Sequence, residues 1–159
     1  MAQAAYIGLG ANLGDPRATL ETVLAELAAA PGVLACRASP FYRSAPLQAS
    51  GPDFVNAVAQ LQTDLAPLAL LDLLQALETR HGRERPYRNA PRTLDLDLLL
   101  FDDMTLAHPR LTLPHPRMHL RAFVLAPLLD LDPGLVLPAG PARTLLSACA
   151  DQAIERLPG

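Results

Sequence analysis

Lysine and tryptophan are both absent from this chain of 159 residues, and cysteine occurs only twice. Without lysine, the chain can contain neither a Walker A phosphate loop nor the strand lysine of a protein kinase. Cys36 and Cys149 are too few for a disulfide framework, and we expect both to be free, buried thiols. Arginine supplies all thirteen basic residues, so any binding of phosphate groups must depend on arginine and on metal ions.

The chain also lacks an apolar run as long as a membrane span and lacks a basic leader segment, which predicts a cytoplasmic protein that does not bind a membrane. Its net charge of −3 does not favour a nucleic-acid surface. Hydrophobic residues make up 50% of the chain, and neither a repeat nor a linker-like composition divides it. We therefore expect residues 1–159 to form a single domain that acts as a monomer.

Local patterns predict strands that alternate with helices. Apolar and alternating runs predict strands over 4–11, 32–44, 53–63 and 91–101, and helical spacing predicts helices over 16–30, 67–82, 118–129 and 143–156. The order βαββαβ is typical of an α+β, ferredoxin-like fold, in which an antiparallel sheet carries both core helices on one face. The C-terminal part would be an extension of that core. We expect the apolar strand 91–101 near the middle of the sheet.

The glycines of "GLGANLG" do not form a dinucleotide-binding motif. Leu13 stands where that motif requires its third glycine. We therefore expect Gly8, Gly10 and Gly14 to form a turn between the first strand and the first helix.

The strand "PRTLDLDLLLF", residues 91–101, places two carboxylates among leucines. Asp95 and Asp97 share one face of the strand, with their side chains roughly 6–7 Å apart. That spacing suits a pair of Mg²⁺ ions, or one ion held between them, with substrate phosphates as further ligands. The alternative is structural, with an arginine from a neighbouring strand pairing each aspartate. A D-x-D pair by itself leaves both interpretations open.

Arginines gather on both sides of this strand. The stretch "GRERPYRNAPR" before it contains Arg83, Arg85, Arg88 and Arg92, and "RLTLPHPRMHLR" after it contributes Arg110, Thr112, His115, Arg117 and Arg121. The first stretch could be a solvated basic loop, but a long irregular loop next to such a carboxylate pair is often a lid. Guanidinium groups bind phosphate oxygens through paired hydrogen bonds. The pattern therefore favours a site for a polyphosphate and its metal ions.

Several stretches together resemble one enzyme family. In order they are "FYRSAPL", "PDFVNAV", "GRERPYRNAPRTLDLDLLLF" and "LTLPHPRMHLRAFVLAPL", and they resemble the 6-hydroxymethyl-7,8-dihydropterin pyrophosphokinases of folate biosynthesis. Those enzymes transfer the pyrophosphoryl group of ATP to the pterin hydroxymethyl group, release AMP, and use a pair of Mg²⁺ ions on a ferredoxin-like scaffold. The resemblance implies the same activity here, with ATP and hydroxymethyldihydropterin as the small-molecule partners.

The resemblance also assigns roles to individual residues. Asp95 and Asp97 would hold the magnesium ions, while Arg83 and Arg92 would neutralise charge on the transferring phosphates. The ATP site would be lined by Gln75, Glu78, Arg85, Leu98, Arg110, Thr112, His115 and Arg121, with Gln75 and Glu78 on the polar side of the second helix. The pterin ring would lie between Phe54 and Phe123, and it would be recognised by Asn56 and the backbone around Ser44, Ala45 and Leu47.

Two other classes of protein remain open at this stage. A nucleotidyltransferase that uses a D-x-D pair would release pyrophosphate from ATP rather than AMP. A ferredoxin-like ligand-binding module would catalyse nothing and would bind its ligand equally well without Mg²⁺.

Overall fold

The computed structural model describes residues 2–45, 52–82 and 94–158. The elements are β1 (Gln3–Ala11), α1 (Pro16–Ala29), β2 (Val33–Ala38), β3 (Tyr42–Ser44), β4 (Phe54–Thr63), α2 (Pro67–Arg80), β5 (Asp95–Phe101), β6 (Leu106–His108), β7 (Leu111–Leu113), a 3₁₀ turn (Met118–Leu120), α3 (Ala122–Leu131), β8 (Val136–Leu137), β9 (Gly140–Pro141), α4 (Ala142–Ala148) and β10 (Ile154–Arg156). Within these ranges no helix has both the length and the apolar character needed to cross a membrane.

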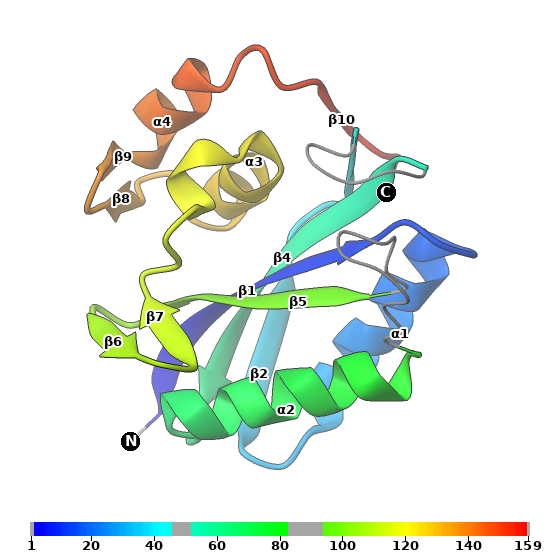
Figure 1. The fold of residues 1–159 in the computed structure, drawn as a ribbon, viewed down its shortest axis with the longest axis vertical. Coiled ribbons are helices and arrows are strands. Elements are labelled where there is room, and N and C mark those ends of the chain that lie inside the picture. Colours follow the sequence, from blue (N-terminus) through cyan, green and yellow to red (C-terminus); the bar gives the residue numbers. More distant parts are fainter. Residues whose placement is uncertain (1, 46–51, 83–93, 159) are drawn as a thin grey trace.

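An antiparallel, six-stranded sheet forms the centre of the molecule (Figure 1). Its strand order is β10-β3-β4-β1-β5, and β2 also pairs with β4. The predicted strand 32–44 is in fact two strands that pair with successive parts of β4. The strand pairing is interrupted between them at Pro40, because proline has no N–H to donate to a neighbouring strand. Ser39 bridges the break, because its backbone N–H donates to the Val58 carbonyl and its Oγ accepts from the Val58 N–H.

β5 lies at the edge of this sheet, so the expectation that strand 91–101 is central is wrong. Its apolar character has another cause, which is that both of its faces are covered. Leu96 and Leu98 face the core below α1 and α2, while Leu99 faces the core below α3. Some backbone groups on the unpaired edge of β5 find other hydrogen-bond partners. A Glu78 carboxylate oxygen accepts from the Leu96 N–H at 2.9 Å, and the His115 backbone N–H donates to the Leu99 carbonyl at 2.9 Å.

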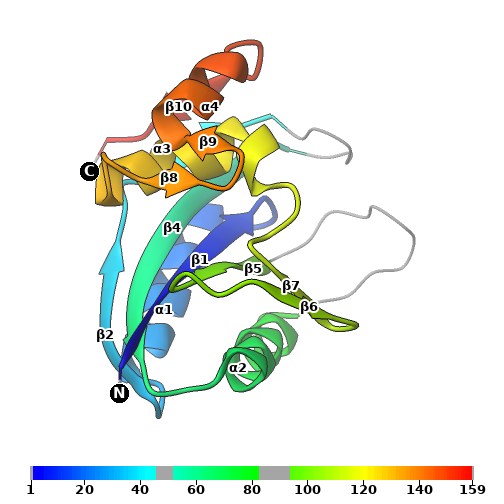
Figure 2. The same ribbon diagram turned by 90° about the vertical axis from the view of Figure 1, so that its left-hand side faces the viewer.

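The helices cover the two faces of the sheet in two groups (Figure 2). The first core packs α1 and α2 against the sheet, and its fully buried side chains include Ile7, Leu20, Leu27, Leu61, Leu70 and Leu74. The second packs α3 and α4 on the other face around Tyr6, Val58, Leu99, Leu125 and Leu128. Each fully buried leucine contributes about 1.5–3 kcal/mol relative to an exposed one, so these cores hold the sheet rigid beneath any site built on it.

The turn after β1 differs from the prediction in one respect. Gly14, with φ of 64°, does lie in this turn, where its positive φ favours glycine. Gly8 and Gly10 instead lie inside β1 and pair with both of its neighbours. The helix then begins as expected, because the Asp15 side chain accepts from the Ala18 N–H at 3.1 Å and Pro16 occupies the first turn.

The C-terminal part departs most from the sequence-based expectation. The predicted helix 118–129 is a 3₁₀ turn followed by α3, and the predicted helix 143–156 ends at Ala148. Beyond Ala148, hydrogen bonds to the start of α3 hold the chain in place of helical ones. The Gln152 side chain accepts from the Ala122 N–H at 2.9 Å and donates to the Leu120 carbonyl at 2.8 Å. The chain then forms β10 beside β3. Cys149 is a buried free thiol as expected, whereas Cys36 is free but only partly buried.

Candidate active site

The carboxylates Asp95 and Asp97 are half-buried on the face of β5 opposite to Leu96 and Leu98, as strand alternation requires. They belong to the face of the sheet that also carries α3. Two carboxylates on one strand match the ligands of Mg²⁺, which binds through one or two carboxylates together with substrate phosphates and water. No cluster of three or more histidine, cysteine, aspartate or glutamate side chains suited to a metal occurs in the part of the chain that the structure describes.

Two side chains with N–H groups, His115 and Arg121, approach Asp97 from the segment before α3. His115 Nε2 lies 3.9 Å from Asp97 Oδ1, and Arg121 Nη1 lies 4.0 Å from Asp97 Oδ2. Burial, reinforced by Arg121 and Arg117, lowers the pKa of His115 from 6.5 to about 4. His115 is therefore neutral at pH 7. Because its Nδ1 accepts from the Arg117 N–H at 3.1 Å, its Nε2 carries the proton and faces Asp97 as a donor.

A buried amide lies on the neighbouring part of the same face. Asn56 in β4 is 5% exposed, and its Oδ1 accepts from the Ser44 hydroxyl at 2.6 Å. This bond fixes the amide so that its Nδ2 donors remain available. Ala45, directly after β3, is exposed, and Leu47 lies outside the described residues. The hydrogen bond between Ser44 and Asn56 brings these two predicted pterin-recognition residues into direct contact.

The two aromatic residues predicted to hold the pterin ring are each half-buried. Phe54 begins β4, and Phe123 lies in the first turn of α3, where it packs at the margin of the second core. The Arg121 guanidinium carbon lies 5.6 Å from the centroid of the Phe123 ring. This places one aromatic face beside the cation that approaches Asp97.

Part of the predicted ATP site also assembles. Arg110 Nη2 donates to Gln75 Oε1 of α2 at 3.1 Å and to Asp72 Oδ1 at 2.5 Å. Thr112, two residues further on, is exposed in the hairpin of β6 and β7. These contacts join α2 to the hairpin, and β7 in turn lies beside β5. The pairing of Arg110 with an exposed carboxylate is one that a phosphate group could replace.

Two of the predicted nucleotide residues are buried. Glu78 was expected on the polar side of α2, but it is 4% exposed and binds the Leu96 N–H of β5. Leu98 is 3% exposed and packs in the first core, so its side chain does not line an open site. Both results follow from β5 lying at the sheet edge against α2. The strand alternation already placed Leu98 opposite to the aspartates, which was a usable signal in the sequence.

The arginines of the stretch before β5 cannot be compared with the structure. Arg83, Arg85, Arg88 and Arg92 lie outside the described residues, so their assignment to the transferring phosphates stays a prediction.

The sequence analysis did not identify Asn12, at the end of β1. It is 2% exposed, its Nδ2 donates to the Pro52 carbonyl at 3.2 Å, and its Oδ1 has no hydrogen-bond partner among the described residues. The contact ties the end of β1 to the segment that leads into Phe54. An asparagine directly after a glycine-containing strand gave no clear sequence signal, because asparagine is also common in turns.

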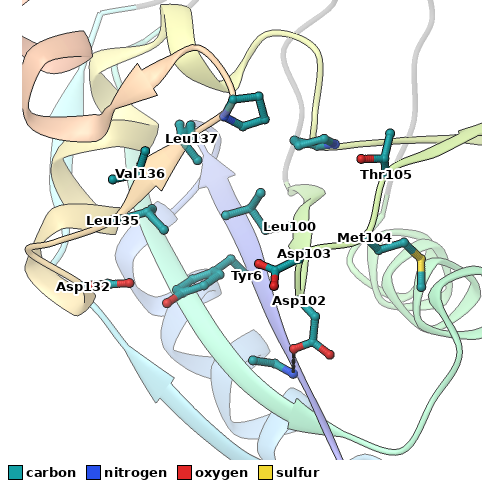
Figure 3. Close-up of a pocket in the computed structure, with 13 residues that line it drawn as sticks. Tyr6, Leu100, Asp102, Asp103, Met104, Thr105, Asp132, Leu135, Val136 and Leu137 are labelled. Atoms are coloured by element: carbon teal, nitrogen blue, oxygen red, sulfur yellow. Dashed lines mark hydrogen bonds between the residues drawn. The ribbon is translucent and has the colours of Figure 1, made fainter.

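A separate cavity of about 480 Å³ lies at the other end of β1 and β5 (Figure 3). It is lined by Ala4, Tyr6, Leu100, Asp102, Asp103, Met104, Thr105, Pro114, Asp132, Leu135, Val136, Leu137 and Pro138. None of the predicted site residues is among them. The Asp102 side chain, in the turn after β5, accepts from the Ala4 N–H at 2.9 Å. Burial and the nearby Asp132 carboxylate raise the pKa of Tyr6, which keeps its hydroxyl protonated.

Comparison with known proteins shows the family to which the chain belongs. The chain is 51% identical over 161 residues to the 2-amino-4-hydroxy-6-hydroxymethyldihydropteridine pyrophosphokinase of Pseudomonas aeruginosa, covering 100% of this chain and 99% of that protein. It is 43% identical to the Haemophilus influenzae protein of the same name, covering 96% of this chain and 97% of that one.

The fold has solved counterparts as well. The crystal structure of Plasmodium falciparum HPPK-DHPS wild type with pterin and p-hydroxybenzoate matches 95% of this chain with a TM-score of 0.74 and 15% identity. The present chain covers 42% of that longer one, and at this identity the match concerns the fold alone. The model of the 7,8-dihydro-6-hydroxymethylpterin-pyrophosphokinase (HPPK) family matches residues 6–133. The chain is therefore a member of the 7,8-dihydro-6-hydroxymethylpterin-pyrophosphokinase family.

Proposed function

We propose that this protein transfers the pyrophosphoryl group of ATP to the hydroxymethyl group of 6-hydroxymethyl-7,8-dihydropterin, giving AMP and the pterin diphosphate for folate biosynthesis. The observation that carries this is the common face of the sheet on which β4 presents Asn56 and β5 presents Asp95 and Asp97. A hydrogen-bonding amide for a heterocycle and a carboxylate pair for metal-bound phosphates are the components that such a transfer requires.

The proposed metal site consists of Asp95 and Asp97, which would hold a pair of Mg²⁺ ions. When bound, the metal would supply neutralisation of the charge on the transferring phosphates. Arg121 lies close enough to Asp97 to contribute to the same neutralisation, and His115 offers a neutral donor beside it. Arg110 and Gln75, which meet at the junction of α2 and the hairpin, would bind the nucleotide, together with Thr112.

For the pterin, Asn56 would recognise the polar edge of the ring, while Phe54 and Phe123 would stack on its faces. Neither a serine nor a cysteine lies beside a histidine in these motifs, so we propose direct attack of the hydroxymethyl oxygen on the β-phosphorus. The role of the protein is then to position the reactants and to neutralise charge. Arg83 and Arg92 are proposed to close over the phosphates, as inferred from the sequence.

The nucleotide product tests this proposal directly. The purified protein is incubated with Mg·ATP and hydroxymethyldihydropterin, and the products are separated by chromatography. We expect AMP and the pterin diphosphate, with no AMP when either the pterin or Mg²⁺ is omitted. Release of pyrophosphate from ATP would indicate a nucleotidyltransferase instead, and unchanged ATP with pterin binding that is independent of Mg²⁺ would indicate a binding module.

At the level of the whole domain, we propose a ferredoxin-like monomer that works in the cytoplasm. The position of β1 between β4 and β5, with α1 and α2 on one face, supports the fold assignment. Helices of the same chain cover both faces of the sheet, which supports a monomer. Light scattering on the eluted protein should give the mass of one chain, and a dimer mass would contradict the monomer.

A further inference from the structure

A glycine lies between the amide that would bind the pterin ring and the carboxylates that would bind the metal. In the register of the sheet, Gly10 of β1 pairs with Asn56 on one side and with Asp95 on the other. Directly paired residues of neighbouring strands present their side chains on the same face. Strands lie about 4.8 Å apart, so Asn56 and Asp95 are separated by roughly 10 Å, with only the backbone of Gly10 between them.

The backbone of β1 does not itself require glycine at this position. Among the glycines that the structure describes, those with positive φ are Gly14, Gly32, Gly82 and Gly140, and Gly10 is not one of them. A β-carbon added at Gly10 would lie 3.2 Å from Asn56 Nδ2, 3.8 Å from Phe54 Cδ1 and 4.0 Å from the Val55 carbonyl oxygen. The two nearest groups are thus side chains assigned to the ring.

Gly8, two residues earlier on the same face, has different surroundings. A β-carbon there would meet the methyl groups of Leu99 at 3.5 Å, which is an ordinary contact with a flexible core side chain. Gly8 pairs with Asp97, but the three atoms nearest to its added β-carbon all belong to Leu99 of the second core, whereas those nearest at Gly10 include atoms of both Asn56 and Phe54.

The amide beside Gly10 is held by a hydrogen bond. Asn56 is 5% exposed, and its Oδ1 accepts from the Ser44 hydroxyl at 2.6 Å. Its Nδ2 lies 3.2 Å from the position that a Gly10 β-carbon would take, so a side chain at residue 10 would press on this amide.

We propose that Gly10 sets the shape specificity of the acceptor site. Its missing side chain keeps open the passage along which the one-carbon arm of the pterin runs from the ring at Asn56 to the carboxylate of Asp95. This inference rests on the proposed function, since it takes the pterin as the occupant. Gly10 would then determine specificity for the pterin because it has no side chain that could block the hydroxymethyl group.

The test compares Gly10→Ala with the matched control Gly8→Ala. Calorimetry measures the binding of two ligands, 6-hydroxymethylpterin and pterin without a substituent at carbon 6, each with Mg²⁺ and a nonhydrolysable ATP analogue present. In Gly10→Ala we expect the affinity for 6-hydroxymethylpterin to fall about 10-fold or more, as for overpacking of a close-fitting site, and that for unsubstituted pterin to fall clearly less. Gly8→Ala should keep both affinities within about three-fold of wild type, because the atoms nearest to its methyl group belong to Leu99 at 3.5 Å or more, an ordinary contact.

Each other outcome has a definite meaning. Wild-type affinity in Gly10→Ala, or an equal loss for both pterins, would overturn the inference. So would a fall of more than about 5 °C in the Tm of the ligand-free Gly10→Ala protein, because it would show that the space belongs to the core. If the wild type itself binds no 6-hydroxymethylpterin and forms no AMP, the proposed function fails. Normal wild-type turnover with an unaffected Gly10→Ala variant refutes the role of Gly10 alone.

Discussion

Replacement of Glu78 tests whether the metal-binding strand is held in place from α2. The Glu78 carboxylate is buried and accepts from the Leu96 N–H, the peptide group between the two aspartates, at 2.9 Å. A hydrogen bond to a charged group contributes about 1.5–3 kcal/mol, and Glu78→Ala also leaves the N–H of an edge strand unpaired. We therefore expect Glu78→Ala to lose about 2–3 kcal/mol of folding free energy, a fall of roughly 4–12 °C in Tm for a domain of this size.

The same variant should lose activity for a geometric reason. A displacement of about 1 Å of catalytic groups can cost about 10²-fold in rate, so kcat should fall by up to this factor as Asp95 and Asp97 shift with the strand. Glu78→Gln retains an oxygen that can accept from the Leu96 N–H, and it should recover most of both losses.

Differential scanning calorimetry and steady-state kinetics measure the two effects. Glu21→Ala, which removes an exposed carboxylate from α1, serves as the control and should match wild type in both. If Glu78→Ala behaves like wild type, the anchoring role is refuted. Equal losses in Glu78→Gln and Glu78→Ala would show that the negative charge, rather than the acceptor, is what matters.

Three further predictions follow from the site. Asp97→Asn should lower Mg²⁺-dependent turnover about 10²-fold or more while the protein stays folded in EDTA; near-normal turnover would refute the metal assignment, and unfolding in EDTA would favour a structural ion pair. Phe123→Ala should weaken pterin binding by about 1–3 kcal/mol in calorimetry and leave the affinity for an Mg·ATP analogue within a few-fold, whereas loss of both would make Phe123 a core residue. The pKa of His115 is lowered to about 4 in the folded protein, against 6.5 for an ordinary histidine. Between pH 6.5 and pH 4 the imidazole is therefore protonated in the unfolded chain but not in the folded one. The free energy of unfolding is unaffected by this histidine above pH 6.5 and falls as the pH is lowered across that interval. Chemical denaturation in EDTA should therefore show His115→Gln gaining up to about 2 kcal/mol relative to wild type between pH 7 and pH 5, and an equal difference at both pH values would contradict this.

Much of the local structure was predictable from the sequence. The first helix follows from Asp15, Pro16 and the apolar spacing after them, and β1 and β4 follow from apolar runs of sufficient length. The common face of Asp95 and Asp97 follows from strand alternation alone. The candidate site was predictable to the same extent, because these two aspartates and the motifs that flank them are contiguous in the chain. The comparisons confirm the family that the motifs predicted, and the roles of the individual residues stay predictions.

The tertiary structure decided what depends on neighbours distant in sequence. The sequence of β5 is equally compatible with a central strand and with an edge strand covered by α2, and only strand order distinguishes the two. Glu78 has the same helical spacing whether it faces solvent or β5, and its burial depends on where that edge lies. Gly10 resembles a turn glycine in the sequence, and only the pairing of β1 with both β4 and β5 places it between Asn56 and Asp95. Side-chain periodicity is a local property that the sequence determines, whereas strand order and burial arise from packing between segments far apart in the chain.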